Sequence, residues 1–181
     1  METFKLDWTA LQHKIFRFLC MNAGRNFNLS EIARNLKVSP TAVSKSLINL
    51  KKEEIVIIKE RGTMNLLSIE LNLENQRVME LKKVENLEMI YESGLISFLS
   101  EHLPGTTIIL FGSYSRGDDT FSSDIDLAII GRKEKSIDSS KFEKILKKKI
   151  ALNFYNNFKI IDKNLKNNLL NGVVLSGVLE L

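Results

Sequence analysis

The feature that most constrains this chain is the stretch of residues 106–130, where a Gly-Ser pair and an Asp-x-Asp pair lie within two apolar runs. Residues 106–111 are β-branched and apolar, which predicts a buried strand. The second apolar run contains Asp124 and Asp126 and ends at Ile130. Side chains two residues apart in a strand point to the same face, so we expect these carboxylates to project together, with Cα atoms roughly 7 Å apart.

Two carboxylates on one face of a core strand indicate metal binding rather than packing. Mg²⁺ takes carboxylate oxygens together with phosphate oxygens. Gly112 and Ser113 end the first strand, and ten residues separate Ser113 from Asp124. Backbone N–H groups and a hydroxyl at such a turn can hold phosphate oxygens, as helix N-termini and turn nests do. The alternative is a surface loop with both Asp side chains in solvent.

This spacing and its flanking strands resemble the nucleotidyltransferase signature of the DNA polymerase beta superfamily. The Gly-Ser-Tyr-Ser-Arg-Gly form of residues 112–117 resembles the minimal nucleotidyltransferases (MNT) of prokaryotes. The resemblance covers roughly the last half of the chain and implies Mg²⁺ as cofactor, with ATP or another nucleoside triphosphate. It implies that Gly112 and Ser113 bind the nucleotide, while Asp124 and Asp126 bind metal and act in catalysis.

Arg116 leaves two interpretations open. It is a candidate nucleotide-binding residue through a phosphate, but a salt bridge to Asp118 or Asp119 explains its presence as well. The neighbouring Tyr114 is expected to pack rather than to react.

The family pattern also has a third carboxylate on the next strand, which we expect at residues 150–155. Asn153 is the best match for this acid, and an amide offers a carbonyl oxygen without negative charge. Asp162 is a second candidate, although its position favours a helix N-cap. The departure at Asn153 favours nucleotide binding with slow or absent transfer, and we expect Asn153→Asp to raise transfer.

The first 73 residues predict a second, smaller domain. Polar residues at Thr9, Asn28 and Ser39 are suited to cap three successive helices. Two apolar runs at 55–58 and 65–69 follow, joined by a turn containing Gly, which is typical of a β-hairpin. Three helices followed by a hairpin is the order of a winged helix-turn-helix.

This region resembles the DNA-binding regulators of the MarR and ArsR kind. Residues 1–73 hold 11 Lys+Arg and 7 Asp+Glu, whereas residues 74–181 hold 15 of each, so the whole excess of +4 lies here. A basic excess suits a nucleic-acid partner. The alternative is a packing module with a solvated polar face. The DNA-binding candidates are Ser39, Thr41, Ser44, Lys45, Asn49 and Lys52, which lie on the outward side of the third helix, and Arg61 in the wing turn.

Residues 74–93 predict a charged connector helix without Gly or Pro. Its apolar residues Val78, Leu81, Val84 and Leu87 recur every three positions, so their stripe drifts around the axis. We therefore expect either a helix that turns its face from one domain to the other or a break near Asn86.

Residues 141–149 predict a further helix in the second half of the chain. Phe142, Ile145 and Leu146 are expected to face inward. The run of three lysines at 147–149 is expected to be a solvated helix end, with contact to nucleic acid or a triphosphate as the alternative.

Together these patterns predict an α+β or α/β protein in three parts. They are a winged helix-turn-helix DNA-binding domain at 1–73, the connector helix at 74–93 and a nucleotidyltransferase-like domain of DNA polymerase beta type at 94–181, with a small mixed sheet flanked by helices. Cys20 is the only cysteine, which favours the reducing cytoplasm. No apolar stretch approaches the roughly 18 residues of a membrane helix, so no membrane partner is expected.

Two functions of different class remain. The first is a nucleotidyltransferase that transfers AMP from ATP to an acceptor, which the MNT resemblance implies can be a HEPN-type protein partner. The second is a DNA-binding regulator or antitoxin-like protein whose nucleotidyltransferase-like domain binds nucleotide or a partner. A scaffold in which neither surface binds is a third interpretation. The expected partners are double-stranded DNA and a nucleoside triphosphate, and a homodimer is left open.

Overall fold

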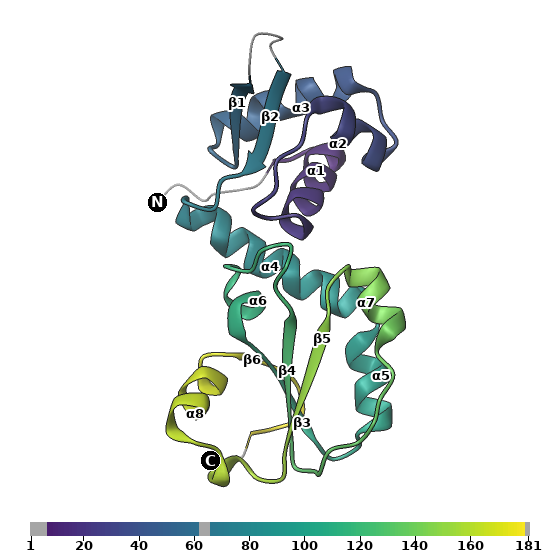
Figure 1. Cartoon of the computed structure of the whole chain (residues 1–181), viewed down its shortest axis with the longest axis vertical. Coiled ribbons are helices and arrows are strands. Elements are labelled where there is room, and N and C mark those ends of the chain that lie inside the picture. Colours follow the sequence, from purple (N-terminus) through teal and green to yellow (C-terminus); the bar gives the residue numbers. More distant parts are fainter. Residues whose placement is uncertain (1–6, 62–65, 180–181) are drawn as a thin grey trace. The chain divides into compact units, whose positions relative to one another are not determined.

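A computed structural model describes residues 7–61 and 66–179, together with all side chains in these ranges except those of Arg61 and Leu66. The chain forms two compact units, Met1–Val78 and Met79–Leu181 (Figure 1). No helix within the described ranges is long and apolar enough to cross a membrane.

The first unit contains three helices followed by a two-stranded antiparallel sheet. Polar side chains cap the helices as predicted: Thr9 and Asn28 each form a complete capping box, and Ser39 accepts a hydrogen bond from the backbone N–H of Ala42. This element order is that of a winged helix-turn-helix. The elements are α1 (Ala10–Met21), α2 (Leu29–Leu36), α3 (Pro40–Lys52), β1 (Val56–Arg61) and β2 (Leu66–Leu71).

The core of this unit forms around α3 and the hairpin. Val43, Leu47 and Leu50 of α3 are buried, as the helical periodicity predicts. In the hairpin, Val56 pairs with Leu71, and this antiparallel register continues to the ends of both strands. The turn between β1 and β2, where the wing was predicted, lies outside the described residues.

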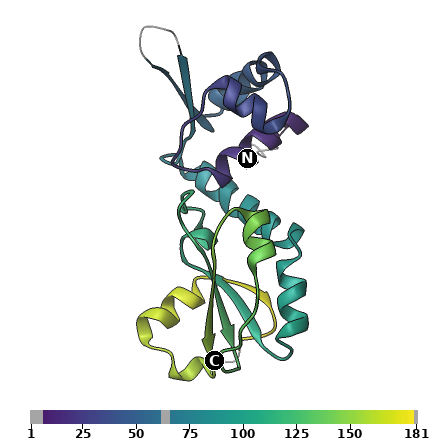
Figure 2. The same ribbon diagram turned by 45° about the vertical axis from the view of Figure 1, so that its right-hand side comes forward.

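The second unit is built around one mixed four-stranded sheet (Figure 2). The strand order is β5-β4-β3-β6, in which β4 and β5 are parallel and the other neighbours are antiparallel. The strands are β3 (Thr107–Phe111), β4 (Ile125–Ile130), β5 (Ile150–Tyr155) and β6 (Val173–Ser176). The helices are α4 (Gln76–Glu92), α5 (Leu95–His102), α6 (Gly112–Arg116), α7 (Ser140–Leu146), the 3₁₀ turn η1 (Phe158–Ile160) and α8 (Lys163–Leu170).

Helices cover both faces of this sheet, with α8 on one face and α5 and α7 on the other (Figures 1 and 2). Ile109 of β3 and Ala128 and Ile130 of β4 pack in one apolar cluster with Leu169 of α8. Because side chains alternate along a strand, Asp126 shares this face of β4 with Ala128 and Ile130. The carboxylate therefore lies on the α8 face, at the end where the apolar cluster stops.

The connector is one continuous helix, so the alternative of a break near Asn86 is wrong. Its predicted apolar stripe is also wrong in part, because the Val84 side chain is 63% exposed whereas Lys82 and Asn86 are fully buried. Lys82, Asn86 and Ile90 recur every four residues and lie on one side of α4, while Val84 lies opposite Lys82. Buried hydrogen-bond acceptors near Lys82 and Asn86 explain why polar residues take the inward positions.

The predicted helix at 141–149 ends earlier, at Leu146, because Lys147 adopts a left-handed conformation with φ of 55°. Phe142 and Leu146 are buried as predicted, but the expectation for Ile145 is wrong, since its side chain is 55% exposed. Lys148 is likewise not part of a solvated helix end, because it is buried and ion-paired.

Candidate functional site

The Gly-Ser turn and the Asp pair meet at one end of the sheet. Asp126 pairs with Phe111 across the β3–β4 ladder, and Gly112 follows Phe111 directly. Gly112 has a φ of 74°, and a Cβ atom built on it would lie 2.6 Å from Oδ2 of Asp126. Glycine is therefore favoured at residue 112 for two reasons, the positive φ and the close approach of the Asp126 carboxylate.

The two carboxylates influence each other electrostatically. Burial raises the pKa of Asp126 above its usual range, and the negative charge of Asp124 raises it further. Asp124 is exposed at the start of β4, whereas Asp126 is partly buried. The ionised form of Asp126 is therefore disfavoured, and a bound divalent cation would stabilise it. The donor set therefore fits a hard cation whose remaining ligands come from water or phosphate.

Ser113 lies in the first turn of α6, partly buried and next to Gly112. The first N–H groups of a helix have no intrahelical acceptor, so the backbone here offers donors beside the Ser113 hydroxyl. Tyr114 is 1% exposed, which confirms that it packs. Arg116 forms a salt bridge with Asp118 through Nε at 3.2 Å and Nη2 at 3.1 Å, so the alternative role of this arginine is the one present in the structure.

The register of β5 places Ala151, and not Asn153, directly beside Asp126. Asn153 lies on the same face but pairs with Ala128, one position further from the Gly-Ser turn. Matching Asn153 to the missing acid is therefore wrong by one position on this face. The conclusion that β5 offers no carboxylate beside the Asp pair still holds, because the residues on this face are Ala151, Asn153 and Tyr155.

Asp162 caps α8, which confirms the structural interpretation of this residue. Its Oδ1 atom accepts hydrogen bonds from the backbone N–H groups of Asn164 and Leu165, both at 3.0 Å. Burial raises the pKa of Tyr155, and the Asp162 carboxylate adds to this effect. Tyr155 is four residues along β5 from Ala151, or roughly 13 Å at 3.3 Å per residue. The Asp162 carboxylate therefore acts near Tyr155, at the other end of β5 from Ala151.

Within residues 7–61 and 66–179, no group of three or more His, Cys, Asp or Glu side chains is arranged to hold a metal. The carboxylates that this end of the sheet provides are Asp124 and Asp126. Sequence reasoning missed four buried polar residues around the loop that joins α6 to β4. They are Lys82, Asn86, Asp119 and Lys148. No periodicity identifies them, because their partners are distant in sequence.

The outward side of α3 forms the second candidate site. The predicted DNA-binding residues with exposed side chains are Ser39, Thr41, Ser44, Lys45 and Lys52. Asn49 is partly buried and donates a hydrogen bond to Oε1 of Glu53 at 3.1 Å, so its amide is already engaged. Ile48 stands among the exposed residues with 70% of its surface accessible. The expectation that Arg61 lies in the wing turn is wrong, because it is the last residue of β1 and pairs with Leu66. Its side chain lies outside the described residues.

Comparison with known proteins gives two kinds of match. The family model of the nucleotidyltransferase domain matches residues 92–175, and domains of this family generally use a divalent metal ion. Among curated proteins, none matches significantly.

Several solved structures are similar to part of the chain. Lactococcus lactis ZitR matches with 18% identity and a TM-score of 0.43, over 58% of this chain and 68% of that chain. MepR, a transcription regulator of the Staphylococcus aureus multidrug efflux pump MepA, matches with 24% identity and a TM-score of 0.40, over 53% and 69%. The S. aureus MepR–DNA complex matches with 19% identity and a TM-score of 0.39, over 54% and 79%.

The family match covers β3, α6 and β4, which carry the Gly-Ser turn and both carboxylates, and it extends into β6. Residues 92–175 thus match the model of the nucleotidyltransferase domain, and they follow a unit with the winged-helix order of elements.

Proposed function

We propose that the C-terminal unit binds a nucleoside triphosphate with Mg²⁺ and transfers its nucleotidyl group, as AMP from ATP, to a hydroxyl acceptor. The observation that carries this proposal is the approach of Gly112 to the Asp126 carboxylate. It brings a phosphate-binding turn and a metal-binding carboxylate within reach of one triphosphate. Asp124 and Asp126 hold the metal, and Ser113 with the adjacent backbone N–H groups holds phosphate oxygens.

In this reaction the acceptor oxygen bonds to the α-phosphorus, the bond from that phosphorus to the bridging oxygen breaks, and pyrophosphate leaves. The hydroxyl proton passes to water. Mg²⁺ supplies charge neutralisation for the phosphates when it is bound. Within the chain, Ser113 orients the triphosphate. Asp124 and Asp126 provide the negative charge that holds the metal. Arg116 can contact phosphate only after it leaves Asp118.

We further propose that the N-terminal unit binds double-stranded DNA through the exposed side of α3. Lys45 and Lys52 are exposed there beside hydroxyl-bearing residues, a composition that suits phosphate and base-edge contacts. Mobility-shift titration of the full chain on genomic DNA fragments at low and moderate salt tests this DNA binding.

The acceptor of the nucleotidyl group is a separate question. The resemblance to minimal nucleotidyltransferases supports a protein acceptor, and a HEPN-type partner is the specific form of this proposal.

A second function is favoured by one observation, the position of Ala151. In a two-metal scheme a third carboxylate would bind the metal that activates the attacking hydroxyl, and the residue directly beside Asp126 has only a methyl group. Under this second proposal the domain binds Mg²⁺ and nucleotide as an effector of a DNA-binding regulator or antitoxin-like protein, with slow transfer.

Calorimetry tests the site that both functions share. We expect ATP to bind the full chain more tightly with Mg²⁺ than without it, and Asp124→Asn with Asp126→Asn to abolish this difference. Asp138→Asn is a matched control, because it removes an exposed carboxylate outside the site. Retention of the Mg²⁺ effect in the double variant would place the nucleotide elsewhere. Transfer of radiolabelled AMP by the wild-type chain then separates the two functions.

A further inference from the structure

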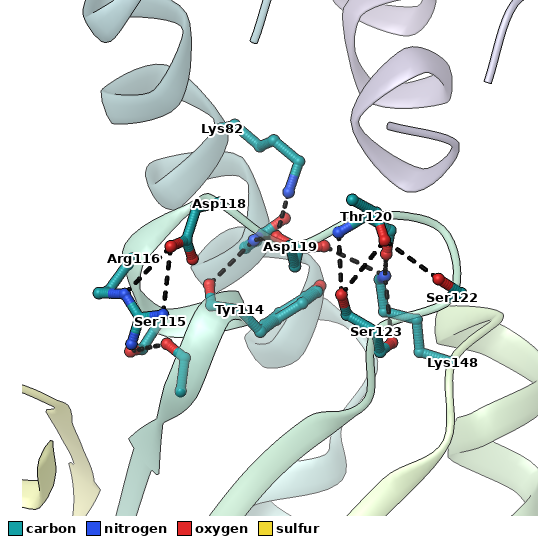
Figure 3. A network of polar contacts seen from close by, with 12 residues as sticks. Lys82, Tyr114, Ser115, Arg116, Asp118, Asp119, Thr120, Ser122, Ser123 and Lys148 are labelled. Carbon is teal, nitrogen blue, oxygen red and sulfur yellow. Dashed lines mark hydrogen bonds and ion pairs between the residues drawn. The ribbon is translucent and has the colours of Figure 1, made fainter. Parts of the chain in front are cut away.

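The loop of residues 117–123, which joins α6 to β4, is held by one buried lysine. Lys148 follows α7, and its side chain is 2% exposed. Its Nζ atom lies 3.1 Å from Oδ2 of Asp119 and donates hydrogen bonds to the carbonyl oxygens of Thr120 at 2.5 Å and Ser123 at 3.4 Å (Figure 3). The ammonium group thus pairs with one carboxylate oxygen and donates to two carbonyl oxygens, all of the same loop.

The other oxygen of Asp119 is bound from α4. Oδ1 accepts from Nζ of Lys82 and, at 2.7 Å, from Nδ2 of Asn86, which also donates to the carbonyl oxygen of Tyr114 in α6 at 2.9 Å. Lys82, Asn86 and Asp119 are all fully buried. The loop is therefore tied on one side to α4 and on the other side to Lys148.

The backbone at the start of this loop also packs closely against the backbone of α4. Gly117 has a φ of 84°, and a Cβ atom built on it would lie 2.3 Å from the carbonyl oxygen of Met79 and 3.0 Å from the backbone nitrogen of Lys83. Within the loop, the N–H of Thr120 donates to the Ser123 hydroxyl at 3.0 Å. Little freedom remains for the chain between Gly117 and Ser123.

This loop connects the two halves of the proposed site. Ser113 precedes it in α6, and Asp124 follows Ser123 directly. We propose that Lys148 is a positioning residue for nucleotidyl transfer, because it fixes the backbone of residues 119–123 and so sets where Asp124 projects relative to Ser113. The proposal rests on the proposed nucleotide function. Asp119, with Lys82 and Asn86, holds the opposite side of the same loop.

A purely structural role is the competing explanation, since a buried ion pair is costly to break wherever it lies. The two explanations differ in what they predict for metal binding. A structural residue lowers the stability of the unit but leaves the affinities of the folded protein unchanged. A positioning residue changes the geometry of Asp124, and mutation of a residue that orients a metal ligand typically costs about 10–100-fold in metal affinity or activity.

The test compares Lys148→Met with Lys149→Met in the full chain. Methionine keeps a long apolar stem and removes the three donors, while Lys149 is the adjacent lysine, 79% exposed, with only a 3.7 Å contact to Glu143. Two quantities are measured well below the melting temperature: the ratio of ATP affinities with and without Mg²⁺, and amide hydrogen exchange in residues 118–124 relative to β3.

We expect Lys148→Met to lower the Mg²⁺-dependent gain in ATP affinity at least about tenfold and to speed amide exchange in residues 118–124, with exchange in β3 unchanged. Lys149→Met should match the wild type in both. If Lys148→Met does not fold, Lys148→Arg replaces it, because the planar guanidinium keeps the positive charge beside Asp119 but cannot direct its donors to Thr120 and Ser123 as an ammonium does.

An unchanged Mg²⁺ effect together with a lower melting temperature would overturn the proposal and leave Lys148 a structural role. A wild-type chain without Mg²⁺-dependent ATP binding would instead refute the proposed function. Hydrogen exchange distinguishes the two failures, because the effect of Lys148 on the loop does not require nucleotide. Unchanged exchange in Lys148→Met would overturn the loop-fixing role itself.

Discussion

Restoring a third carboxylate at residue 151 is the most direct test of how this site is built. Ala151 pairs with Asp126 in the parallel β4–β5 ladder, and directly paired residues of neighbouring strands share a face about 4.8 Å apart. Ala151→Asp therefore places a carboxylate next to Asp126. The pKa of Asp126 is already raised by burial and by the negative charge of Asp124. Under the proposed function, the variant should add a third carboxylate ligand to the metal site of Asp124 and Asp126.

The magnitude follows from the local charge. Two like charges about 5 Å apart repel by roughly 3 kcal/mol at an effective dielectric constant of 20, and solvent at this partly buried position reduces this to roughly 1–2 kcal/mol. In the absence of metal we expect Ala151→Asp to lower the melting temperature by about 4–16 °C, at 4–8 °C per kcal/mol for a unit of this size. Millimolar Mg²⁺ should recover much of this loss, since binding stabilises the folded state.

Transfer is the second readout. A positioned general base contributes about 10²–10⁴-fold, so Ala151→Asp should raise AMP transfer from radiolabelled ATP by at least about tenfold. Ala151→Asn controls for side-chain size, and Asn153→Asp controls for a carboxylate one position further along the same face. A rise in transfer with Asn153→Asp but not with Ala151→Asp would refute the register argument. Brisk transfer by the wild type would show that the third carboxylate is dispensable or comes from a partner.

Three further predictions address charge and binding. Asp126→Asn should raise the melting temperature of the metal-free protein at pH 7 by a few degrees, less than about 1 kcal/mol, because the raised pKa of this carboxyl makes its ionised form costly in the folded state. The gain should shrink as the pH falls toward 3.8, the ordinary carboxyl value, and a lower melting temperature at pH 7 would contradict it. Asp119→Asn should cost about 3–5 kcal/mol in urea denaturation because it removes the carboxylate from a buried pair, whereas Asp118→Asn, which breaks an exposed pair, should cost about 0–1 kcal/mol. Lys45→Ala should weaken DNA binding and lower the slope of log affinity against log salt by about 0.9 per lost phosphate contact. Lys14 is an exposed lysine of α1, and Lys14→Ala should leave both quantities unchanged. Equal effects of the two variants would exclude a specific role for α3.

Much of this protein is determined by signals local in sequence. Caps at Thr9, Asn28 and Ser39 begin helices where the pattern predicts, because a cap needs only the backbone of the next three residues. The spacing of the Gly-Ser and Asp-x-Asp pairs likewise predicts that they meet. The strands β3 and β4, which flank this segment, form an antiparallel pair that brings Asp126 beside Phe111 and next to Gly112.

Only the tertiary structure decides which distant residues face these elements. The β4–β5 register places Ala151 rather than Asn153 beside Asp126. A shift of two residues along this ladder keeps the same side chains on each face of β5, so the apolar alternation in the sequence does not determine the register. Lys82, Asn86 and Lys148 are charged or polar, so periodicity assigns them to the surface. Their nitrogen atoms are buried because Asp119 and the carbonyl groups of Thr120 and Ser123 accept hydrogen bonds from them across gaps of 25–37 residues. Burial of a polar group depends on a partner that the local sequence does not reveal.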